Sequence, residues 1–414
     1  MTLPVLNAII DFSTGPSFAP PAIFGSGKFG IGAFGNKLSV TVDVSDLVDR
    51  METTRGRGVN SDQFNVGKMT MRIVDQTGAF NPQNVSGPYY GLLSPMRKVI
   101  ITATYSATTY PIFAGYITAY DYVIPDNITE IVGHTTITAV DAFQLTNIAT
   151  INAVTGAVAG ETTGVRVGRI LDQINWPSAM RVISSPCQTT VQADPGTSRA
   201  ALNALQNLES TEYGALYIDG SGNFVFNSRR VTELSVASAP TVFDDAGGGI
   251  DYANAVWRLD DSLIWNEANF TRLGGTLQNY RDTASVAQYF LHSSDETGLM
   301  NQTDADVLAN ARAYVSSRST TSVRCDSLIL DLKTTSYTAG ITAALALDFF
   351  SPITVTTHQP GGTALTKTEQ IFGISQSITP QTWQTTFSTM KPVIVSGIFG
   401  NATYGVFGSA IFAY

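Results

Sequence analysis

The sequence of 414 residues is poor in charged side chains and in long hydrophobic runs. Charged residues make up 14%, against about 25% in an average soluble protein. Hydrophobic residues make up 43%, which excludes intrinsic disorder. No hydrophobic run approaches the roughly 20 residues that a membrane-spanning helix needs. Residues 1–10 contain no Lys or Arg, so we also expect no signal peptide.

Positive charge is especially scarce. The chain has 24 Lys and Arg against 33 Asp and Glu, which gives a net charge of −9. The basic cluster Arg55 and Arg57 is too small to form the basic patch of a nucleic-acid-binding protein. We therefore predict no specific binding of DNA or RNA.

Cysteine and histidine, which supply most zinc ligands, are also rare. Cys187 and Cys325 lie far apart, which predicts two free buried thiols rather than a disulfide framework. The histidines are His134, His292 and His358, and none is spaced with another His or a Cys as zinc ligands are. We therefore predict no metal site and no cofactor.

The sequence also lacks a recognisable catalytic motif. It has no G-x-S-x-G nucleophile elbow, and no Lys follows the Gly247–Gly249 run as a phosphate-binding loop requires. A glycosidase needs two carboxyl groups facing each other across a cleft, and nothing marks such a pair. Neighbouring acids are predicted to be solvated turn residues: Asp244–Asp245, Asp260–Asp261 and Asp295–Glu296. We expect no catalytic residues and no enzyme activity.

Alternating hydrophobic and polar residues dominate the first third of the chain. Residues 38–44 place Leu38, Val40, Val42 and Val44 on one face of a predicted half-buried strand. Four further segments have the same alternation: 68–75, 98–105, 111–118 and 130–139. Short strands separated by turn residues predict an antiparallel barrel or sandwich.

The periodicity changes after residue 160. Residues 165–174 fit a helix that ends at Trp176–Pro177, and a second helix is predicted to begin near Thr197. A hairpin turn is predicted at residues 219–222, so this region is α+β. Further along, Thr303 and Asp306 are spaced as the capping box of a helix over 303–318. Strands are predicted around it: 256–273, 328–332, 353–357, 370–375 and 383–388.

These patterns predict a mainly β protein with an α+β insertion and extended termini. We divide it into five segments. Residues 1–37 form an N-terminal arm, 38–150 a first tube-like β domain, 151–245 an α+β middle domain, 246–392 a second β domain with one helix, and 393–414 a C-terminal arm. Both arms alternate Gly with aromatic residues, and neither arm can bury these aromatic side chains by itself. We expect them to dock on another subunit rather than on their own domain.

Several motifs together resemble minor tail proteins of siphophages, in particular those infecting actinobacteria. The resemblance spans roughly residues 38–392. It is carried by Thr54–Arg57, Phe64–Asp75, Gly78–Pro82, Ser86–Tyr90, Leu92–Arg97, Tyr110–Tyr116, Ala201–Phe226, Leu263–Arg272 and Gly373–Pro380 with Trp383. The layout is similar to the baseplate hub, or tail-associated protein, of such phages. In contrast to larger relatives, we expect no lysin-like or fibre-like extension after the second β domain.

The resemblance implies a structural virion protein at the tail tip. Hubs of this family carry two tube-like antiparallel β-barrel or sandwich domains per chain and form homotrimers. Three copies thereby match the six-fold symmetry of the tail tube. The implied roles are closing the tube and organising distal components during host attachment and DNA ejection. The implied partners are the distal tail protein, the tape measure and tail fibres or receptor-binding proteins, with DNA only in transit.

Three alternatives remain open. The chain could be a distal tail protein that forms a hexameric ring, or a hydrolase of cell-wall polysaccharide. It could also be a carbohydrate-binding receptor protein that uses Trp257 and Trp265, although core packing is the favoured interpretation for both. Three-fold or six-fold particle symmetry would distinguish the hub from the ring.

Two sets of residues are candidates for the assembled particle. The candidate assembly contacts are the aromatics of the arms: Phe24, Phe29, Phe34, Phe399, Tyr404, Phe407 and Phe412. A tail lumen must let DNA slide, and an acidic lining repels phosphates, whereas a basic lining would bind them. The candidate lumen acids are Asp43, Asp75 and Asp331, which lie in predicted strands or at their ends. Alternatively, the excess of Asp and Glu lies on the outer surface and keeps the protein soluble.

Overall fold

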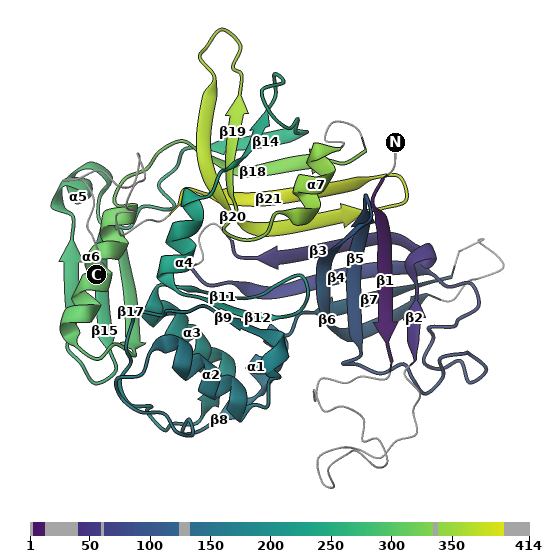
Figure 1. The fold of residues 1–414 in the computed structure, drawn as a ribbon, viewed down its shortest axis with the longest axis horizontal. Coiled ribbons are helices and arrows are strands. Elements are labelled where there is room, and N and C mark those ends of the chain that lie inside the picture. Colours follow the sequence, from purple (N-terminus) through teal and green to yellow (C-terminus); the bar gives the residue numbers. More distant parts are fainter. Residues whose placement is uncertain (1–2, 13–39, 59–61, 124–132, 334–337, 393–414) are drawn as a thin grey trace.

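The computed structural model describes residues 3–12, 40–58, 62–123, 133–333 and 338–392 (Figure 1). In these residues one sheet of thirteen strands forms the body of the protein, and three smaller sheets accompany it. This confirms the predicted fold class, mainly β and antiparallel with α+β parts. None of the helices in the described segments is long and apolar enough to cross a membrane.

The first β unit supplies one end of the large sheet, in the order β3-β4-β7-β6-β5-β1-β2. Alternation builds these strands: in β4, Met69, Met71 and Ile73 are fully buried while the intervening side chains face solvent. The elements are β1 Val5–Asp11, β2 Thr41–Asp43, η1 Ser45–Leu47, β3 Val48–Gly56, β4 Asn65–Val74, β5 Lys98–Tyr105, β6 Thr108–Val123 and β7 His134–Val140.

The second β unit supplies the other end of the sheet, in the order β14-β18-β21-β20, with β19 paired to β20 and β13 paired to β19. The β13–β19 pair is parallel and its neighbours are antiparallel. Its elements are β13 Thr241–Asp244, β14 Asn254–Arg258, β18 Arg324–Asp331, α7 Ala339–Ala346, β19 Pro352–Thr357, β20 Leu365–Ile378 and β21 Trp383–Met390.

The two β units are joined by antiparallel pairing of β3 with β20, in a register that runs from Gly56 opposite Gly373 to Met51 opposite Ile378. One hydrophobic core therefore runs through both units and includes Met51, Phe243 and Phe387. Gly56 has a φ of +118°, and a Cβ there would lie 2.3 Å from the Phe372 carbonyl oxygen. The join thus requires a residue without a side chain.

Two insertions lie at one side of the sheet (Figure 1). The first contains α1 Phe143–Ile148, β8 Thr150–Ile151, α2 Thr163–Gln173, η2 Ser178–Met180, β9 Arg181–Ile183, β10 Arg199–Ala200, α3 Ala201–Glu212, β11 Ala215–Ile218, β12 Phe224–Asn227, α4 Arg229–Leu234 and η3 Ser235–Ala237. The second contains β15 Glu267–Arg272, β16 Gln278–Arg281, α5 Thr283–Tyr289, β17 Ser293–Leu299 and α6 Asp304–Arg318, and it has a small core of its own.

Several local predictions are confirmed. Residues 98–105 form β5, and the 219–222 turn joins β11 to β12. Thr303 caps α6 in a capping box with Asp306. Cys187 and Cys325 are both buried and free.

Other predicted boundaries are wrong because long-range pairing decides them. Residues 5–11 of the predicted arm form β1, which pairs with β5. In the described part of the predicted 38–44 strand, residues 40–44, strand structure covers Thr41–Asp43. The helix expected from Thr197 begins at Ala201, because Arg199–Ala200 pair with β8 as a strand. Residues 241–244, assigned to the middle domain, belong to the second β unit. The described part of 246–392 holds three α-helices instead of one.

The close approach at Gly56 can be tested by substitution. We expect Gly56→Ala to lower the free energy of unfolding by at least about 3 kcal/mol, because the Cβ adds a backbone clash to an unfavourable φ. Gly91→Ala is the matched control, since Gly91 also has a positive φ (+75°) but open space around it, and should cost about 1 kcal/mol. Urea unfolding measures both variants. Equal losses would contradict the role given to the β3–β20 contact.

Candidate functional site

The main polar cluster lies where the β units and both insertions meet. We call it the junction and define it by Arg57, Asp62, Glu209, Tyr314 and Arg318, which all line one pocket. These residues come from the segment after β3, from α3 and from α6. The junction therefore brings together parts of the chain that are more than 250 residues apart.

Arg57 connects the first β unit to the second. Its guanidinium stacks over the rings of Phe372 (4.2 Å to the centroid) and Phe64 (5.5 Å), and it donates to the Asp62 carbonyl oxygen (2.7 Å). Burial lowers the pKa of Arg57 to about 10. Arg55 is also buried, with its guanidinium 5.2 Å from the Phe349 ring centroid. Arg55 and Arg57 are therefore packed against aromatic side chains rather than displayed as a basic patch.

Asp62 connects the same segment to the second insertion. Arg318 donates to one of its carboxylate oxygens (2.9 Å) and the Tyr314 hydroxyl donates to the other (3.2 Å). The Asp62 side chain is 46% exposed. Partial desolvation by the surrounding protein raises its pKa, but the Arg318 and Arg57 guanidinium groups outweigh this effect, so the pKa lies below its ordinary value. Asp62 is thus held as a carboxylate between two cations.

Glu209 of α3 is the buried acid of the junction, and it is only 3% exposed. Its Oε1 accepts from the Leu216 amide (2.7 Å), while its Oε2 has no hydrogen-bond partner among the described residues. Burial raises the pKa of Glu209 to about 8. At neutral pH this side chain is therefore largely a neutral carboxylic acid.

The predicted lumen acids occupy three different environments. Asp75 was expected to face a lumen, and this is wrong for the described chain: it is 4% exposed and accepts from the amides of Ala79 and Phe80 (both 2.8 Å). Its carboxylate instead stabilises the turn after β4 through these hydrogen bonds. Asp43 is exposed in β2, where hydrogen bonds from Ser45 lower its pKa. Asp331 is half-buried at the end of β18.

The seven aromatic residues proposed as assembly contacts lie outside the described residues. Trp257 and Trp265 do lie within them, and both are half-buried against hydrophobic cores. Trp257 also donates to the Thr357 hydroxyl (2.9 Å). Both tryptophans therefore contribute to packing, as the favoured interpretation predicts.

Of the acids considered for catalysis, Asp260 is engaged in an ion pair with Arg324. Arg324 donates to both oxygens of Asp260 (3.1 and 3.2 Å), and these bonds with Arg324 lower the pKa of Asp260. His292 pairs with the Tyr289 carbonyl oxygen (3.1 Å).

His358 lies close to two acids, because the fold brings it to Asp244 and Asp245. These three side chains could offer ligand atoms to a metal ion. Sequence reasoning missed this group because 113 residues separate His358 from Asp245.

Comparison with known proteins rests on the fold. No protein-family model matches the chain, and no curated protein matches it. The 43 kDa tail protein of prophage MuSo2 from Shewanella oneidensis is similar, with a TM-score of 0.54 and 12% identity over 86% of this chain and 97% of that one. The tail protein from Neisseria meningitidis MC58 is similar with a TM-score of 0.57 and 10% identity over 95% and 98%. The chain has the fold of tail proteins.

The raised pKa of Glu209 predicts a pH dependence of stability. Between its usual pKa of 4.5 and about 8, the folded protein keeps the proton that the unfolded chain releases, so stability falls as pH rises. Glu209→Gln keeps an acceptor for Leu216 but cannot ionise. We expect its stability relative to wild type to rise from pH 5 to pH 8, by at most about 1.4 kcal/mol per pH unit.

Urea unfolding of both proteins at pH 5, 6.5 and 8 measures this difference. Glu52→Gln, at an exposed carboxylate of β3, is the control and should show no such trend. A Glu209→Gln difference that stays constant over this range would show that burial does not raise the pKa of Glu209.

Proposed function

We propose that this chain is a structural component of a phage tail. The supporting observation is the tail-protein fold, shared with the MuSo2 prophage protein over nearly its full length. The described structure offers contact surfaces and buried ion pairs rather than an arrangement of nucleophile, base and cleft. We accordingly propose an assembly role and no enzymatic one.

Within the tail, we propose the position of a baseplate hub at the tip. Each chain holds two β units joined edge to edge through β3 and β20. Three copies would thus present six units, which fits a six-fold tube above them. The two ends of the large sheet, β2 and β14, each pair on one side only within the described segments, which leaves a free strand edge for a neighbouring copy.

The hub proposal includes closing the tube, host attachment and passage of DNA during ejection. Its partners would be another tail ring, the tape measure and fibres, and its location the virion tail tip. The net charge of −9 supports a lumen that repels phosphates. Asp43 and Asp331 remain candidates for that lining. Asp75 does not, because it is buried.

Symmetry tests the hub position. We expect the purified full chain, or tails that contain it, to show three-fold symmetry by electron microscopy and a trimer mass in solution. The reason is that each copy carries two β units. A six-fold ring of single copies would contradict the hub and favour the distal tail protein.

The termini can be tested in an assembly assay. Any deletion must keep β1, because Asp11 pairs with Thr41 and Phe12 is fully buried. A short Gly-Ser linker can therefore replace residues 14–38 without removing β1. We expect this variant, and one lacking residues 393–414, to keep the wild-type melting temperature but to fail to enter particles, because their aromatics are contact residues. Normal incorporation of both variants would refute the assembly role of the arms.

A further inference from the structure

The Asp244–Asp245–His358 cluster lies where two strands of the second β unit end together. Asp244 is the last residue of β13, and His358 directly follows β19. Because β13 and β19 run parallel, with Asp244 opposite Thr356, their carboxyl ends meet at one edge. The cluster shares no residue with the junction pocket.

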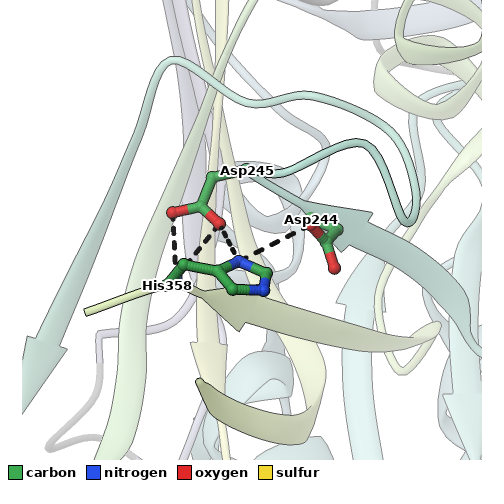
Figure 2. Close-up of side chains that lie close together, drawn as sticks. All are labelled: Asp244, Asp245 and His358. Atoms are coloured by element: carbon green, nitrogen blue, oxygen red, sulfur yellow. Dashed lines mark hydrogen bonds and ion pairs between the residues drawn. The ribbon is translucent and has the colours of Figure 1, made fainter. Parts of the chain in front are cut away.

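The three side chains point toward one another (Figure 2). His358 Nδ1 lies 2.6 Å from an Asp245 carboxylate oxygen and 3.8 Å from Asp244 Oδ1. One ligand atom from each residue can be chosen so that all three lie within 4.8 Å of one another. A tetrahedral zinc ion with bonds of about 2.0–2.2 Å needs ligand atoms roughly 3.3–3.6 Å apart, so small side-chain rotations complete the geometry.

The backbone already orients both carboxylates. The Ala246 amide donates to Asp244 Oδ1 (2.7 Å), and the His358 amide donates to both Asp245 oxygens (3.1 and 3.0 Å). Gly248 leaves room for Asp244, because a Cβ at that position would lie 2.7 Å from Asp244 Oδ2. Hydrogen bonds of this kind fix ligands before a metal binds.

In the described part of the chain, the negative charge of the cluster is not balanced by Lys or Arg. The acids Glu161, Glu267 and Asp304 are each neutralised by an Arg. Within the described residues, Asp244 and Asp245 form ion pairs with His358 alone, not with Lys or Arg. Two carboxylates beside one imidazole therefore leave negative charge that a divalent cation would balance.

We propose that Asp244, Asp245 and His358 bind a divalent transition-metal ion, with zinc as the reference case, and that the ion ties the end of β13 to the end of β19. The imidazole favours a zinc-like ion over calcium or magnesium, which prefer oxygen ligands. Three protein ligands leave a fourth position for water or for a side chain of a neighbouring subunit. The imidazole is 49% exposed, so the site is accessible from solvent.

Metal titration of the full chain tests this inference. In metal-free buffer, calorimetry with Zn²⁺ should show one site per chain, and Co²⁺ should give the visible absorption of a low-coordinate nitrogen-oxygen site. His358→Ala and Asp245→Asn should each weaken Zn²⁺ binding by about tenfold or more, because each removes a ligand. Zn²⁺ should also raise the melting temperature of the wild type but not of these variants.

His292→Ala is the matched control, because this histidine lies in the second insertion and binds the Tyr289 carbonyl oxygen. It should bind Zn²⁺ as the wild type does, and circular dichroism checks that every variant is folded. The inference is overturned if the wild type shows no stoichiometric Zn²⁺ binding. It is likewise overturned if the His358 and Asp245 variants bind like wild type, or if Mg²⁺ or Ca²⁺ binds more tightly than Zn²⁺.

Discussion

The structure depends on the hydrogen bonding between β3 and β20. This pairing merges two β units into one sheet, and the core that runs through both units exists only because their edges meet. Its tightest point is Gly56 against the Phe372 carbonyl, where a Cβ would lie 2.3 Å from the oxygen. The two insertions, which are attached to these units, are positioned relative to that contact.

The junction lies next to this contact and connects it to the second insertion. Arg57 directly follows β3 and stacks on Phe372 of β20, while Asp62 of the same segment binds Arg318 of α6. Burying charged groups is expensive unless they are paired. The largely buried Arg57 and Arg318 are paired with the half-exposed Asp62, whereas Glu209 avoids the cost by remaining protonated. The second insertion, which has a small core of its own, is therefore connected through a polar network, whereas the first insertion shares the main hydrophobic core.

This arrangement suits a protein that works through its surfaces. In the proposed assembly role, the double β unit would repeat around an axis, and the insertions and termini would contact other components. A metal ion bound by the Asp244–Asp245–His358 cluster would hold the ends of β13 and β19 together within the second unit. The three side chains of this cluster belong neither to the hydrophobic core nor to the junction pocket, so their removal should leave the body folded.

Sequence alone determined the fold class and some of the local elements. Alternation placed β5, turn residues placed the Asp219–Gly222 hairpin, and residue spacing placed the Thr303 capping box, because these depend on neighbours close in the chain. Only tertiary structure decided the rest. Residues 5–11 became a strand because β5 offers them an edge, and Asp75 became buried because a turn folds over its carboxylate. The junction and the Asp244–His358 cluster unite residues far apart in sequence, and no local periodicity encodes which distant side chains the sheet register will bring together.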